Sequence, residues 1–99
     1  MIWITDAEKA KGTYEILIRF NDGKYTIVDL KNTIEKDHRP IIRDLLDVNI
    51  FNSFAVANDT VCWKNGVDFA PEYLYKIGQK KEMAGLAQRE NQDIMTNTK

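Results

Sequence analysis

Two carboxylates, Asp68 and Glu72, lie four residues apart where a turn leads into a predicted helix. A carboxylate pair can bind a divalent metal ion or act as general acid and base. The same positions also suit a structural role. Asp68 comes just before a helix that Pro71 begins, where a carboxylate accepts hydrogen bonds from unpaired backbone amides, and Glu72 favours the helix dipole. We prefer this structural interpretation and keep a small enzyme using Asp68 and Glu72 as the second alternative.

One histidine and one cysteine are the other side chains with reactive potential. His38 lies in the polar segment 36–40, where no neighbour is identifiable that would orient its imidazole as a general base. Cys62 alternates with Val61 and Trp63 in a predicted strand, which favours a half-buried packing residue over a reactive thiol. The common glycine loops, nucleophile turns and zinc-binding helix motifs are also missing from the sequence. We therefore predict no catalytic residue, no metal and no cofactor.

The composition predicts a single domain. Of 99 residues, 43% are apolar and 29% are charged, which is typical of a globular protein and provides for one core. A lone cysteine cannot form an internal disulfide, which favours a reducing compartment, the cytoplasm. The sequence shows no leader peptide and no run of about 20 apolar residues that could cross a membrane. The formal charge is -1 with scattered basic residues, so direct binding to DNA or RNA is disfavoured.

An antiparallel meander of three strands is predicted to open an α+β fold. Residues 14–20 alternate between apolar and polar side chains, with the period of two that marks a strand with one buried face. Residues 25–30 run back as the next strand. Residues 2–10, which end at Lys11-Gly12, supply the third strand because the connecting loop is short.

The turn of this meander also predicts a register. The Asp-Gly pair at 22–23 suits the positive φ angles of a tight hairpin. If these two residues form the whole loop, Phe20 faces Tyr25 and Ile18 faces Ile27.

Two or three short helices are predicted to follow the meander. Residues 30–36 form a short helical turn, and residues 40–46 form a helix with Pro40 at its favoured first position. Asp47 can cap a further turn through its carboxylate. A second β-hairpin then pairs residues 54–57 with 60–63 around Asn-Asp, two residue types that tolerate left-handed turn geometry.

A last helix is predicted to close the compact domain. The Asn-Gly pair at 65–66 turns the chain, and residues 71–77 form a helix that stops at Gly78. We therefore place one domain over 1–78. Residues 79–99 form a polar C-terminal tail, helical in part or frayed, with a weak apolar stripe.

The stretch from Trp63 to Tyr75 holds the candidate interaction residues. Aromatic side chains dominate interaction hot spots, but they are equally typical of a small protein core, and both interpretations stay open here. The candidates are Trp63, Asn65, Gly66, Asp68, Phe69, Pro71, Glu72, Tyr73 and Tyr75.

The stretch 60–75, TVCWKNGVDFAPEYLY, resembles a bacterial family known as domain of unknown function 2442. The resemblance extends upstream to Phe-Asn-Asp-Gly at 20–23 and to Val-Asp-Leu at 28–30, and it covers about residues 1–78. Family members usually have Trp-Pro-Asn-Gly where this chain has Trp-Lys-Asn-Gly at 63–66. This difference loosens the turn but keeps the Asn-Gly geometry.

The resemblance implies a small α+β fold, found alone or ahead of a helix-turn-helix domain, and genes that often adjoin another small protein in a suspected toxin-antitoxin pair. It implies no catalytic residues. Residues 79–99 are too few for a helix-turn-helix domain. The leading hypothesis is therefore a non-enzymatic protein-interaction module, antitoxin-like or regulatory, whose partner is the adjacent gene's product. The first alternative is the dimerising or sensing half of a DNA-linked transcription regulator. A homodimer is a further expectation, since the meander leaves free strand edges.

Overall fold

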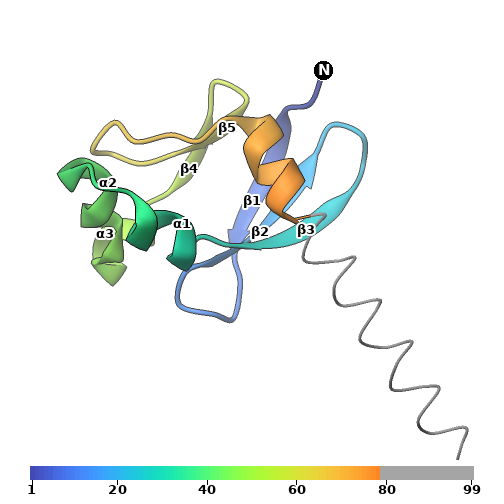
Figure 1. Ribbon diagram of the computed structural model, residues 1–99. Coiled ribbons are helices and arrows are strands. Elements are labelled where there is room, and N and C mark those ends of the chain that lie inside the picture. Colours follow the sequence, from blue (N-terminus) through green and yellow to red (C-terminus); the bar gives the residue numbers. More distant parts are fainter. Residues whose placement is uncertain (79–99) are drawn as a thin grey trace, which may run out of the picture.

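The computed structural model describes residues 1–78 and has the predicted α+β architecture (Figure 1). Its main sheet has three antiparallel strands in the order β1-β2-β3. They are β1 (Ile4–Lys9), β2 (Glu15–Phe20) and β3 (Tyr25–Asp29). The predicted meander is confirmed. The predicted tail, 79–99, lies outside the described residues.

Short helices and a second hairpin complete the described chain. The helical elements are α1 (Lys31–Lys36), α2 (Pro40–Arg43), the 3-10 turn η1 (Asp44–Leu46) and α3 (Val48–Phe51). A two-stranded sheet follows, made of β4 (Ala55–Ala57) and β5 (Thr60–Cys62), and residues 71–78 are helical. Within residues 1–78, no helix is long and apolar enough to cross a membrane.

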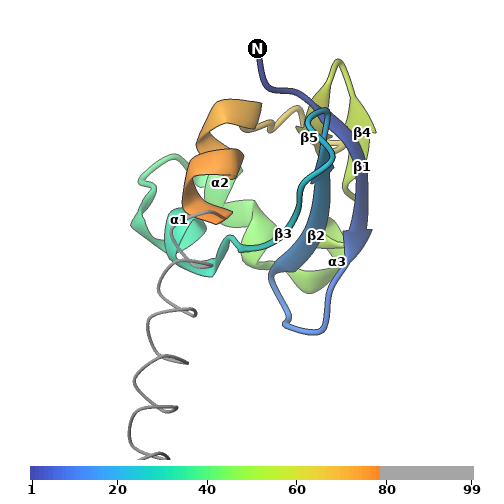
Figure 2. The same cartoon turned by 90° about the vertical axis from the view of Figure 1, so that its right-hand side faces the viewer.

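One core joins the sheet to the helices. In Figure 2 α1, α2 and the orange helix over 71–78 lie on one side of the three strands, while β4 and β5 lie beside β1. The alternation along β2 buries every second side chain against this layer. Fully buried side chains come from both layers: Ile16, Ile18, Phe20, Val28, Leu30, Ile34, Leu45, Phe51 and Leu74. Elements from β1 to the last helix therefore share one apolar cluster.

The register between β2 and β3 differs from the prediction by one residue. Ile18 pairs with Thr26, and Tyr25 pairs with Arg19 instead of Phe20. The reason lies in the loop: Phe20 N donates to Lys24 O at 2.9 Å, so the loop holds three residues and ends in Gly23 with φ +86. A slip of one residue moves every side chain to the other face. Tyr25 is therefore exposed, although the prediction had placed it opposite a core residue.

Ile27 changes face for the same reason. It pairs with Leu17 on the outer side of the sheet and is 42% exposed, so the predicted pair with Ile18 is wrong. Thr26 takes the inner position and is 7% exposed.

The second hairpin and the Asp47 cap are both confirmed. Asn58 and Asp59 have φ angles of 52 and 67, the left-handed geometry of a two-residue hairpin loop. The Asp47 carboxylate accepts hydrogen bonds from Asn49 N and Ile50 N at the start of α3. Ile4 N donates to Asp59 O at 2.9 Å, which fixes the hairpin to the edge of β1.

The last helix includes Gly78, the residue predicted to stop it. Gly78 is itself helical and its φ is not positive, so its predicted role as the C-terminal stop is wrong. The structure gives another reason for a glycine. A Cβ at this position would lie 2.6 Å from Thr26 Cγ2, so only a residue without a side chain allows the helix to approach β3 this closely.

Candidate functional site

The predicted motif begins with Trp63, which is 4% exposed. Its indole Nε1 donates a hydrogen bond to the carbonyl of Phe51 at 2.8 Å, and the two rings lie 5.8 Å apart. A buried indole needs such a partner, because an unpaired buried donor costs free energy. Trp63 therefore belongs to the core and leaves no group free for chemistry.

Asn65 and Gly66 make the predicted turn. Gly66 has φ +92, which a side chain would strain, and Val67 N donates to Asn65 Oδ1 at 3.2 Å. The amide group of Asn65 also donates to Ile41 O at 3.2 Å, 24 residues away. The turn thus ties the motif to α2.

Phe69 and Tyr73 form an aromatic wall at the other end of the motif. Their rings stack at 6.2 Å with an interplanar angle of 27°, and Phe69 also meets the edge of Trp63 at 5.7 Å. The Phe69 carbonyl accepts a hydrogen bond from Thr60 Oγ1 at 2.5 Å. Phe69 is half-buried, whereas Tyr73 is 39% exposed. The wall therefore starts in the core and ends at the surface.

Tyr75 faces away from this wall. Its ring packs edge-on against Phe20 at 4.9 Å, and its hydroxyl donates to Asp22 Oδ2 at 2.8 Å. It therefore fastens the last helix to the β2–β3 turn.

Asp68 does not cap the last helix, which corrects the prediction. Pro71 is the first helical residue, so the N-cap is Ala70, whose carbonyl accepts from Tyr73 N at 3.0 Å and Leu74 N at 3.2 Å. Asp68 lies two residues too early. It is exposed, and its backbone forms an isolated bridge with Cys62.

Glu72 is also exposed, in the first turn of the helix, where its charge suits the helix dipole. In the part of the chain that the structure describes, no group of three or more His, Cys, Asp or Glu side chains could hold a metal ion. His38 is exposed in its loop, and Cys62 is a half-buried free cysteine whose Sγ donates to Ala55 O at 3.6 Å.

An open pocket of about 510 Å³ lies where α1 and the loop after it face the start of the last helix. Asp68 and the aromatic wall form one side, and α1 with its C-terminal loop forms the other. The lining residues are Asn32, Thr33, Lys36, Asp37, Arg39, Asp68, Phe69, Ala70 and Tyr73. Four residues of the predicted motif, three of them candidate interaction residues, therefore meet the segment 32–39.

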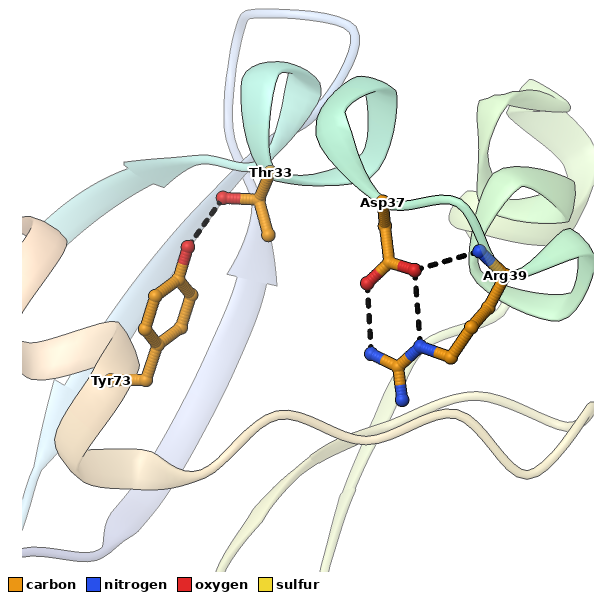
Figure 3. Close-up of polar contacts among 4 residues, drawn as sticks. All are labelled: Thr33, Asp37, Arg39 and Tyr73. Carbon is orange, nitrogen blue, oxygen red and sulfur yellow. Dashed lines mark hydrogen bonds and ion pairs between the residues drawn. The ribbon is translucent and has the colours of Figure 1, made fainter.

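Polar contacts hold the shape of this pocket (Figure 3). The hydroxyl groups of Thr33 and Tyr73 lie 2.8 Å apart and join α1 to the last helix. Arg39 donates to both carboxylate oxygens of Asp37, from Nε at 3.0 Å and from its terminal nitrogen at 2.8 Å. Arg39 N also donates to Asp37 Oδ1 at 2.9 Å. In Figure 3 the third guanidinium nitrogen of Arg39 points away from Asp37.

These contacts lower the pKa of Asp37. The side-chain hydrogen bonds from Arg39, followed by the one from the Arg39 amide, lower it from 3.8 to about 2. The Arg39 side chain is 70% exposed and that of Asp37 is 19% exposed. The pair therefore remains charged at neutral pH and presents donor groups to solvent at the mouth of the pocket.

The prediction missed Thr33, Asp37 and Arg39. The sequence did contain a signal for the ion pair of Asp37 and Arg39, because these opposite charges lie two residues apart before a helix that starts with proline. It contained no signal that Thr33 belongs to the pocket, since only the folded chain brings Thr33 to Tyr73, 40 residues later.

Comparison with known proteins identifies the family but provides no relative with an established role. No curated protein and no solved structure matches the chain. A family model described as "Protein of unknown function (DUF2442)" matches residues 9–80, which include β2, β3, the pocket and the motif. The chain therefore belongs to the DUF2442 family.

Proposed function

We propose that this chain is a non-enzymatic protein-interaction module that binds a protein partner across the pocket between α1 and the last helix. The observation that carries the proposal is the aromatic wall of Phe69 and Tyr73, which ends at the surface inside a pocket rimmed by charged side chains.

The pocket combines the two features of a typical interaction surface. Exposed Tyr73 offers a large ring with one polar end, and tyrosine is enriched at interaction hot spots. Around it, Lys36, Arg39 and Asp68 supply a polar rim with both charges. The Thr33–Tyr73 contact holds the ring in place, so binding would cost little side-chain entropy.

The proposed partner is the product of the adjacent gene, in an antitoxin-like or regulatory relationship. Support comes from the gene neighbourhood that membership of this family implies. We place this interaction in the cytoplasm, which fits the free thiol of Cys62.

Co-expression with the adjacent gene product, followed by affinity capture, tests this proposal. Asn32→Arg places a long side chain at the exposed α1 rim of the pocket and should abolish the complex. Asn49→Arg is the matched control, because it makes the same exchange at an exposed position on α3 that does not line the pocket. Failure of the unaltered chain to form a complex would overturn the proposed function. A complex that survives Asn32→Arg would show that the partner binds elsewhere.

A further inference from the structure

The two edges of the main sheet differ in how they are protected. At the β1 edge, the register is interrupted between Ile4 and Asp6, and Ile4 N is bonded to Asp59 O of the second hairpin. Such irregularities and covering loops are how proteins prevent edges from pairing. Among the described residues, 1–78, nothing gives the β3 edge either device. Its pairing with β2 is regular from Tyr25 to Asp29, and the strand contains no Pro, Lys or Arg.

The hydrogen bonds at both ends of β3 show which backbone groups face outward. Phe20 N donates to Lys24 O, and Leu30 N donates to Tyr14 O, each at 2.9 Å. In an antiparallel ladder the bonded residues alternate, so even-numbered residues of β3 point their amides and carbonyls toward β2. The odd-numbered residues point theirs toward the free edge: Tyr25, Ile27 and Asp29. Their side chains are also exposed, at 55% for Tyr25 and 42% for Ile27.

We propose that the chain self-associates by pairing β3 with β3 of a second copy, which extends the sheet from three strands to six. The pairing is antiparallel and centred on Ile27, because only this register joins all three outward-facing residues to outward-facing residues. Ile27 then lies opposite Ile27 of the second copy, and Tyr25 lies opposite Asp29 of the second copy. This interface is separate from the pocket and does not depend on the proposed partner.

Side chains on the outer face suit this arrangement. Leu17 is the cross-strand neighbour of Ile27, so pairing would create a continuous apolar stripe of two leucines and two isoleucines. Arg19 lies over the Tyr25 ring at 5.4 Å, which places its positive charge beside Asp29 of the second copy. No residue pair between the two copies places like charges opposite each other. A second copy therefore satisfies both the apolar and the charged groups that this edge exposes.

The mass of the full chain in solution, measured by sedimentation over a concentration series, tests the proposal. We expect a dimer whose dissociation constant rises about a hundredfold in Ile27→Lys, because each dimer then loses two buried isoleucines. Val56→Lys is the matched control: Val56 is 38% exposed on β4, away from the proposed interface, and its substitution should leave the dimer unchanged. A chain that stays monomeric, or an Ile27→Lys dimer as tight as the unaltered one, would overturn the proposal.

Two further variants test the register. Tyr25→Asp should weaken the dimer, because it places a carboxylate opposite Asp29 of the second copy, whereas Tyr25→Asn, which removes the ring without adding a charge, should weaken it less. If both variants weakened it equally, the register centred on Ile27 would be wrong.

Cross-linking provides a second measurement of that register. Ile27→Cys in a Cys62→Ser background should form a disulfide between copies, since bonded pairs have Cα atoms about 5.5 Å apart. Val56→Cys in the same background should not cross-link. The absence of an Ile27→Cys cross-link in a dimeric sample would also contradict the register.

Discussion

The hydroxyl of Tyr75 donates a hydrogen bond to the carboxylate of Asp22 at 2.8 Å and joins residues 53 positions apart. The Tyr75 ring also packs against Phe20, and Lys24 Nζ lies 5.7 Å from its centre. The Tyr75 side chain therefore joins the last helix to the end of β2, to the turn after it and to the charged amino group of Lys24.

Tyr75→Phe should raise the pKa of Asp22 toward its ordinary value of 3.8. In the unaltered chain the pKa is lowered, first by the Lys24 amide and next by the Tyr75 hydroxyl, so removing the hydroxyl cancels only part of the effect. An NMR titration of the Asp22 carboxyl carbon measures this change. Tyr73→Phe is the control, because it removes a hydroxyl that contacts Thr33 instead. An unchanged Asp22 pKa in Tyr75→Phe would show that the contact is absent in solution.

Asp37→Asn should reduce stability in a pH-dependent way. The pKa of Asp37 is lowered from 3.8 to about 2 in the folded chain, so its ion pair stabilises the fold fully above 3.8. That stabilisation is lost as the pH falls from 3.8 through about 2. Urea unfolding at several pH values should therefore show the two proteins converging in acid. The control is Asp68→Asn, an exposed carboxylate that lacks this ion pair. A difference between the proteins that persists at the lowest pH would contradict the prediction.

Trp63→Phe should lower the free energy of unfolding by about 2 to 4 kcal/mol, because it leaves the Phe51 carbonyl without its indole partner and opens a cavity. Urea unfolding followed by circular dichroism measures the loss. Trp3→Phe is the natural comparison, since Trp3 is 40% exposed and its substitution should change stability by only about 0.5 kcal/mol. Equal effects of the two substitutions would mean that Trp63 is not a core residue.

Gly78→Ala should destabilise the protein by about 1 to 3 kcal/mol through overpacking, although alanine normally stabilises a helix relative to glycine. The added Cβ would meet Thr26 Cγ2 and Oγ1 at 2.6 Å. Thr26→Ala should relieve the clash and cost little by itself, because the buried Thr26 hydroxyl has no hydrogen-bond partner within the described chain. Thermal unfolding of the two single variants and the double variant gives the coupling free energy between positions 26 and 78. If the changes in the free energy of unfolding were additive, the predicted contact between the added Cβ at position 78 and Thr26 would be ruled out.

Local patterns predicted most of the secondary structure, because the physics behind them acts over a few residues. The alternation along 14–20 gave a strand with one buried face, and the Asp47 carboxylate capped α3. Asn58-Asp59 formed the left-handed loop of the second hairpin. The motif was also sufficient to identify the family.

Features that depend on a choice between two local geometries were predicted less well. Asp22-Gly23 fits either a two-residue or a three-residue loop, and the extra loop residue moved Tyr25 and Ile27 to the outer face. Asp68 stood near enough to a helix start to be taken for its cap, but Pro71 fixed the N-cap at Ala70.

The amino-acid sequence by itself determined the elements, the family and the aromatic character of the motif. The tertiary structure decided the pocket, because Thr33 meets Tyr73 and α1 faces the Phe69 wall only once the helices pack. It also decided which sheet edge stays free within residues 1–78, since the second hairpin covers β1 and not β3. Both are contacts between residues far apart in the chain, and such contacts arise from packing the whole core, which no short stretch of sequence encodes.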